Sequence, residues 1–245
     1  MDATVDTIIG WSHEDGLRVA VGVNAHVCNL ARHDEGLSDF LDDSDLNYAD
    51  GQSVVWASRI VGLEVPERAA TTDLAPPLLR AAADEGVRVF FYGGRPGVAE
   101  QAAEAMRRIA PGVQIATHHG YVKREQMSTV LDAIRAHGTD LLFVGLGDPA
   151  QQEWVRDHGP SSGASVVLTC GGLFDWLSGA NKRAPSWMIA AGLEWMWRLV
   201  IEPKRLARRY LVGNPAFVLA LARQLANSRT RSIGQAGHGS ASLAS

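Results

Sequence analysis

The chain has 245 residues and a formal net charge of −4. Its residues are 46% hydrophobic, 20% charged and 7% aromatic, a composition that excludes a disordered or fibrous protein. The length suits one sizeable α/β domain. Its two cysteines, Cys28 and Cys170, are too few for a disulfide framework, and no CxxC pair offers a zinc site. No signal-peptide pattern opens the chain and no run of ~20 apolar residues occurs, so we expect a cytosolic protein that is soluble or peripheral.

The first part of the chain predicts one strand followed by several helices. Residues 17–23 predict the strand, residues 26–41 a helix that ends in an acidic cluster, and residues 51–61 another helix. Thr71, Thr72 and Asp73 resemble the N-cap of a helix that continues over residues 74–85. The first fifteen residues show no clear periodicity, so no element is predicted there.

A repeated strand–turn–helix pattern follows. It predicts strands at residues 87–92, 113–116, 141–144 and 165–170, and helices at residues 98–109, 123–137 and 151–157. Strands that alternate with helices of this length indicate an α/β fold. We therefore expect a Rossmann-like, mostly parallel sheet covered by helices on both faces.

The composition changes near the C-terminus, where tryptophan and arginine become frequent. We expect an α/β catalytic domain over residues 1–195, a basic helical appendage over residues 196–227, and a disordered tail over residues 228–245 that is rich in Ser, Gly and Ala. Pro203 is expected to divide two helices of the appendage, because proline is poorly tolerated inside a helix.

Positive charge is concentrated in the same region. Between residues 182 and 231 there are ten Lys or Arg residues and only two acids. A basic end on an otherwise acidic chain predicts an anionic partner for that end. Phosphates, anionic lipid headgroups and nucleic acid all satisfy this prediction on charge alone.

Two glycine-containing turns each follow a predicted strand and precede a predicted helix. In the first, Gly93, Gly94 and Arg95 would bring a phosphate to a helix N-terminus, although an ordinary turn between strand and helix is an equal alternative. The second, residues 145–150, fits the dinucleotide fingerprint G-x-G-x-x-A only weakly, because the next strand does not end in the expected acid. We favour an interpretation in which this turn presents its backbone and Gln151 to a nucleotide or a sugar.

Acidic residues at two places are candidates for chemistry. Asp43 and Asp45 have the spacing of a D-x-D metal site, but their position in an acidic run at a helix end favours a surface role. Asp50 stands alone before an apolar segment, where a carboxylate serves either as a catalytic base or as a cap for the next helix. The pattern by itself favours the cap.

Short segments spread over most of the chain match the WecG/TagA/CpsF family of glycosyltransferases in their number, order and spacing. They are residues 24–25, 49–51, 66–68 with Asp73, 91–97, 145–151, 171–175 with Gly179, 183–185, 192–198 and 202–205. The chain therefore resembles this family from about residue 19 to residue 217.

The resemblance implies an inverting glycosyltransferase that needs neither a metal ion nor another cofactor. It implies transfer of an N-acetylmannosamine-type sugar from a UDP-sugar to an undecaprenyl-diphosphate-linked acceptor, for cell-surface polysaccharide or teichoic acid, at the inner face of the cell membrane. Asp50 would be the general base. The residues implied to bind the substrates are Asn24, Arg68, Gln151, Arg198, Arg205 and Arg208. The three arginines after residue 195 would belong to an appendage that closes over the site and meets an anionic membrane. No nucleic acid partner is expected. The oligomeric state is left open.

Three positions depart from the family pattern. Gly22, Gln152 and Cys170 stand where a threonine, a glutamate and a glycine are usual.

Two alternatives of other classes also remain open at this point. One is a Rossmann-type NAD(P)-dependent oxidoreductase that uses the turn at residues 145–150, and the other is a non-enzymatic protein that binds anionic lipid or nucleic acid through its basic end.

Overall fold

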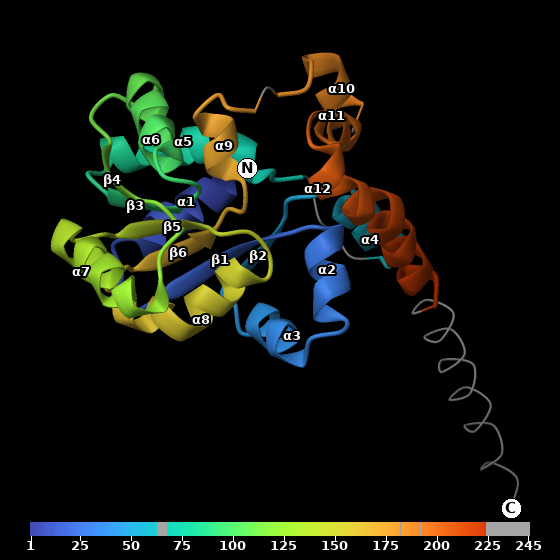
Figure 1. Ribbon diagram of the computed structural model, residues 1–245, viewed down its shortest axis with the longest axis horizontal. Helices are drawn as coiled ribbons and strands as arrows, with labels where there is room; N and C mark the ends of the chain where they lie inside the picture. The colour runs from blue at the N-terminus through green and yellow to red at the C-terminus, as the bar shows by residue number, and fades with distance from the viewer. Residues whose placement is uncertain (63–67, 182, 192, 224–245) are drawn as a thin grey trace, which may run out of the picture.

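The computed structural model describes residues 1–62, 68–181, 183–191 and 193–223, and its centre is a six-stranded, entirely parallel sheet. The strands are β1 (Arg18–Val23), β2 (Leu46–Ala49), β3 (Arg88–Gly93), β4 (Gln114–His118), β5 (Leu141–Gly145) and β6 (Val166–Thr169). Their order across the sheet is β2-β1-β6-β5-β3-β4, and helices cover both faces (Figure 1). The predicted Rossmann-like α/β fold is confirmed.

Each face of the sheet has its own layer of helices. One layer contains α1 (Asp2–Trp11), α5 (Thr71–Asp84), α6 (Val98–Ile109) and α9 (Leu173–Leu177). The other contains α3 (Glu35–Asp42), the short η1 (Arg124–Gln126), α7 (Met127–His137) and α8 (Ala150–Ser162). Helices α2 (Ala25–Ala31) and α4 (Gln52–Ile60) follow the carboxyl ends of β1 and β2.

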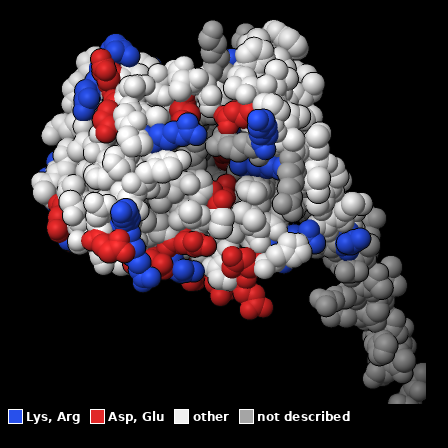
Figure 2. Space-filling view, in the orientation of Figure 1, with Lys and Arg blue, Asp and Glu red and all other residues white. Residues whose placement is uncertain are grey.

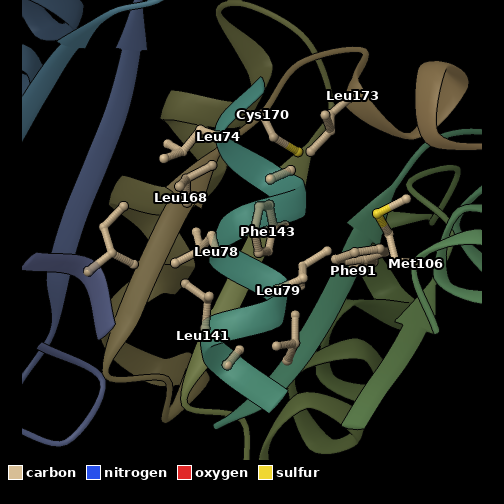
Figure 3. Close-up of a cluster of buried hydrophobic side chains, with 14 of the residues drawn as sticks. Leu74, Leu78, Leu79, Phe91, Met106, Leu141, Phe143, Leu168, Cys170 and Leu173 are labelled. Carbon is tan, nitrogen blue, oxygen red and sulfur yellow. The ribbon is translucent and has the colours of Figure 1, made fainter. Parts of the chain in front are cut away.

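The alternation of side chains along the strands explains why both faces are apolar. In β3, Val89 and Phe91 pack under α5 and α6, whereas Phe90 and Tyr92 point to the opposite layer. Figure 3 shows the larger of the two cores, in which leucines of α5 lie against aromatic and aliphatic side chains of the strands. The ring of Phe91 lies 5.3 Å from that of Phe143 between centroids. Strands buried on both faces are typical of parallel sheets.

Several elements differ from the expectation. The single helix predicted over residues 26–41 is two helices, α2 and α3, and neither α1 nor β2 was predicted. Helix α1 buries Val5, Ile8 and Ile9 on one side, which is a helical spacing hidden among polar residues. The N-cap of α5 is Ala70, so the prediction that residues 71–73 form the cap is wrong: they already belong to the helix.

The C-terminal part forms a group of helices beside the α/β body rather than a layer of it (Figure 1). These are α10 (Ser186–Ala190), α11 (Glu194–Ile201), α12 (Pro203–Ala207), the π-helical turn η2 (Arg208–Val212) and a helical stretch over residues 213–223. A helix that begins at Pro203 confirms the predicted division. The tail predicted from residue 228 lies outside the described residues, and none of the helices within them is long and apolar enough to cross a membrane.

Candidate functional site

A cavity of about 330 Å³ lies where the carboxyl edge of the sheet meets the C-terminal helices. The segments that follow four strands contribute to it: Asn24 follows β1, Asp50 follows β2, Gln151 at the start of α8 follows β5, and Cys170 follows β6. The C-terminal helices add Glu194, Trp195, Arg198, Arg209, Asn214 and Val218. Charged side chains of both signs gather around the hollow between the two parts (Figure 2). Ligands of open α/β sheets bind at this edge.

Asp50 is held by the start of a helix that is distant in sequence. Its Oδ1 atom accepts hydrogen bonds from the backbone N–H of Thr71 at 2.7 Å and from the Thr71 hydroxyl at 2.9 Å. The alternative in which Asp50 caps the next helix is therefore wrong, because the N-cap of α4 is Gly51. Asp50 instead accepts a hydrogen bond from the N-terminus of α5. Among the described residues no hydrogen bond to the other oxygen, Oδ2, is found, and Asp50 lines the cavity.

Asn24 joins the end of β1 to the C-terminal helices. As the N-cap of α2 it accepts hydrogen bonds from the backbone N–H groups of His26 and Val27, and the same oxygen accepts one from Nη2 of Arg209 at 3.0 Å. The sequence did not single out Arg209, although it belongs to the counted basic run. Burial, and then the positive charge of Arg209, lowers the pKa of His26, which favours the neutral ring at the cavity wall.

Arg68 ties the α/β domain to α11. Its Nη2 atom lies 2.6 Å from Oε2 of Glu194 and 3.7 Å from a carboxylate oxygen of Asp73. Arg183 extends the group through an ion pair of 2.6 Å with Asp73. The side chains of Arg68 and Glu194 are only 16% and 11% exposed, so this pair is shielded from water more than an ordinary surface ion pair.

Gln151 fixes the loops after β5 and β6 relative to each other. Its Nε2 atom donates to Oδ1 of Asp148 at 2.7 Å, and its Oε1 accepts from the backbone N–H of Gly171 at 2.8 Å. Gln152, where the family pattern has glutamate, donates to the same Asp148 oxygen at 2.8 Å. Asp148 and Gln151 both line the cavity.

Two residues that line the cavity each carry a buried polar atom without a partner among the described residues. These atoms are Nε of Arg198 and Oγ1 of Thr169. The guanidinium of Arg198 lies over the ring of Trp176, 5.2 Å from its centroid. A buried polar group without a partner is costly, so these atoms favour a polar occupant of the cavity.

Tryptophans form much of the apolar wall of the cavity. Trp56 from α4, Trp176 from α9 and Trp195 from α11 all line it, and the sequence reasoning missed the first two. Trp56 remains 53% exposed although it is the largest side chain of its helix. An aromatic ring left exposed beside a cavity that also contains polar and charged groups is suited to packing against a sugar or a base.

Gly93, Gly94 and Arg95 lie outside this cavity, so their predicted contact with a phosphate stays a prediction. The turns after β3 and β5 do meet as expected: the N–H of Gly94 donates to the carbonyl of Gly145 at 3.2 Å. Gly93 has φ of +143°, and a Cβ atom there would lie 2.6 Å from the carbonyl carbon of Gly145. The glycine at this position is therefore required by the close approach of two backbones.

The remaining predicted residues are two arginines of the C-terminal helices and the acidic candidates before β2. The backbones of Arg205 and Arg208 lie in α12 and η2, while their side chains are outside the described part of the structure. Asp45 bonds to Arg18 and to the backbone N–H of Val19 at the amino end of β1, on the edge of the sheet opposite the cavity. No group of three potential metal ligands is found in residues 1–62, 68–181, 183–191 and 193–223.

The comparisons with known proteins point to one family. The model of the family described as "Glycosyl transferase WecG/TagA/CpsF family" matches residues 1–231. A protein of Bacillus spizizenii named N-acetylglucosaminyldiphosphoundecaprenol N-acetyl-beta-D-mannosaminyltransferase is 36% identical over 197 residues, which is 80% of this chain and 75% of the relative. Proteins with the same name from Bacillus subtilis and Staphylococcus aureus are 32% and 30% identical, covering 85% and 83% of this chain and 80% and 79% of those proteins.

Proposed function

Since the chain belongs to the WecG/TagA/CpsF family and is a glycosyltransferase, we propose that it transfers an N-acetylmannosamine-type sugar from a UDP-sugar to an undecaprenyl-diphosphate-linked acceptor. The names of the relatives support the lipid-linked N-acetylglucosamine acceptor and N-acetylmannosamine as the transferred sugar. The family and these relatives give no support to the oxidoreductase or to the non-enzymatic binder.

The observation that carries the proposed mechanism is the position of Asp50 in the cavity, with one oxygen anchored to Thr71. Asp50 acts as the general base. It takes the proton of the acceptor hydroxyl while the oxygen of that hydroxyl attacks the anomeric carbon of the donor sugar. The bond between that carbon and the diphosphate oxygen breaks, and the nucleoside diphosphate leaves with the bonding electrons. Attack from the side opposite the leaving group inverts the configuration.

The charge that grows on the leaving diphosphate requires compensation. Arg68 lies just before α5, Arg198 lies in α11 and Arg209 lies in η2, and all three line the cavity. Guanidinium groups bind phosphate oxygens through paired donors. Arg205 and Arg208 add to this positive region according to the family resemblance. Arginine and backbone N–H groups stabilise the departing anion, so the reaction proceeds without a metal ion.

The C-terminal helices place the enzyme on the inner face of the cell membrane. Large apolar side chains that remain exposed there support this docking: Trp187, Val200, Leu211, Val212, Val218 and Leu219. Much of the surface over these helices is uncharged in Figure 2. Exposed Lys204 and Arg223 lie on the same segment, so apolar insertion and attraction to anionic headgroups act together.

Binding of the donor is expected to raise the melting temperature, because a ligand that binds the native state stabilises it by mass action. At a concentration of 100 Kd the stabilisation is about 2.7 kcal/mol. Thermal unfolding with UDP-sugars, and with NAD as the control ligand, measures this effect.

Turnover is expected to be unchanged by a chelator of divalent cations. A strict requirement for manganese or magnesium would contradict the metal-free mechanism.

Association with vesicles that contain anionic lipid is expected to weaken as salt rises. Exposed charges are screened over about 8 to 10 Å at ordinary ionic strength, so the electrostatic part of binding is lost at high salt while apolar insertion persists. Co-sedimentation at several salt concentrations measures it, with vesicles of neutral lipid as the control. Equal binding to neutral and anionic vesicles would contradict the role given to the basic residues.

A further inference from the structure

Three oxygen atoms form a line of hydrogen bonds that ends on Asp50. The hydroxyl of Tyr48 lies 2.9 Å from Oγ1 of Thr71, and the Thr71 hydroxyl donates to Oδ1 of Asp50 at 2.9 Å. The two hydroxyl-bearing residues are buried, at 5% and 7% exposure. Tyr48 comes from the end of β2 and Thr71 is the first residue of α5, so the line connects two rigid elements.

The direction of the protons in this line follows from the number of donors. Thr71 has one hydroxyl hydrogen, and it is used toward Asp50, so the hydrogen between the two hydroxyls must come from Tyr48. Burial, reinforced by the negative charge of Asp50, raises the pKa of Tyr48 well above its usual range. The phenol therefore keeps its proton and remains a donor.

Gly22 of β1 lies directly beside these two hydroxyls. A Cβ atom at Gly22 would lie 3.0 Å from the Tyr48 oxygen and 3.1 Å from Oγ1 of Thr71, so a side chain at this position would press on both hydroxyls. Of the three groups in the line, only the Asp50 carboxylate has a second oxygen, Oδ2, that is not bonded within the line.

We propose that Tyr48 and Thr71 are positioning residues of the transferase, which fix the rotamer of Asp50 so that Oδ2 meets the acceptor hydroxyl. This inference rests on the proposed function of Asp50 as the general base. Two donors on Oδ1, the backbone N–H and the hydroxyl of Thr71, hold the carboxylate plane. Tyr48 in turn fixes the direction of the Thr71 hydroxyl. A general base must lie within hydrogen-bond reach of the proton it takes, and small misplacements cost much of the rate.

The substitution Thr71→Val tests the proposal, because it keeps the shape and the backbone N–H but removes the hydroxyl. We expect kcat to fall by about 10- to 100-fold while the Kd of the UDP-sugar changes by less than about twofold. Thr71→Ser restores the hydroxyl and is expected to return kcat to within a few fold of the wild type. A purely structural role would not produce a fall in kcat that serine rescues at constant donor affinity.

Further variants keep the test decisive. Thr71→Val leaves the buried Tyr48 hydroxyl without its acceptor, so the double variant Tyr48→Phe with Thr71→Val is measured as well, since it leaves no hydroxyl unpaired. Ser58→Ala is the matched control, because Ser58 is a buried hydroxyl of α4 whose one hydrogen bond among the described residues goes to the carbonyl of Val55 in the same helix. Its kcat is expected to equal that of the wild type.

The outcome separates the two levels of inference. If Asp50→Asn abolishes most turnover while Thr71→Val and the double variant keep wild-type kcat, the positioning role is overturned and the general base stands. If Asp50→Asn itself keeps wild-type turnover, the proposed mechanism fails, whatever the threonine variants do. A loss in Thr71→Val and in the double variant, rescued by serine, supports the positioning role.

Discussion

Replacing Asp50 with asparagine is expected to lower turnover by roughly 10²–10⁴-fold, which is the usual contribution of general acid–base catalysis. Asparagine keeps an oxygen that can accept the hydrogen bonds of Thr71, but its amide cannot take a proton from the acceptor. Donor affinity and melting temperature should barely change, because the carboxylate acts on the acceptor in the transition state. Steady-state kinetics with a lipid-linked acceptor, donor titration and thermal unfolding measure the three quantities.

Two further variants control this experiment. Asp50→Ala also removes the cap of α5 and is expected to cost about 1 kcal/mol of stability in addition to the lost turnover. Asp45→Asn changes a carboxylate at the opposite edge of the sheet and should leave turnover unchanged. An Asp50→Asn protein that is folded and turns over at the wild-type rate would remove Asp50 from the mechanism.

Gly93→Ala is expected to destabilise the protein by about 3–5 kcal/mol, because the new Cβ atom would collide with the backbone of Gly145 at the junction of β3 and β5. The φ of +143° adds strain that only glycine avoids. Denaturant unfolding gives the change in free energy. The effect would appear in the absence of any substrate, which separates this packing role from contact with a phosphate.

Gly112→Ala is the matched control for Gly93→Ala. Gly112 also has a positive φ, of +94°, but a Cβ atom there would meet nothing within 4 Å. Its loss of stability should be only about 1 kcal/mol, from the backbone conformation alone. Equal losses in the two variants would show that the predicted collision is relieved by a small shift of the turn.

The sequence was most informative where regular patterns are long. Residues 87–109 contain an uninterrupted apolar run, a glycine turn and an alanine-rich amphipathic helix, and they form β3 and α6 as predicted. By contrast, β2 (Leu46–Ala49) has four residues beside an acidic run, so its pattern is too short to distinguish from a loop. It becomes a strand because β1 offers a partner for its backbone.

The site was less accessible to prediction because its contacts are distant in sequence. The bond from Thr71 to Asp50 spans 21 positions and the one from Arg209 to Asn24 spans 185, and no local spacing reports either. Both glycine turns were found, but only the turn after β5 contributes to the cavity, because the strand order places β5 between β3 and β6. The family resemblance, rather than any pattern of spacing, indicated Asn24 and Arg68, which the structure brings to the cavity.

The place of β6 has a consequence for how the enzyme is made. The last strand of the sheet to leave the ribosome, β6, pairs with β1 on one side and with β5 on the other. Without it, the first two strands and the group of β3, β4 and β5 have no backbone ladder to join them. A nascent chain that ends before Val166 therefore has neither a continuous sheet nor the loop at residues 170–172 that completes the cavity. Assembly of the catalytic edge is thus a late event on the ribosome, governed by contacts far apart in sequence, which form slowly.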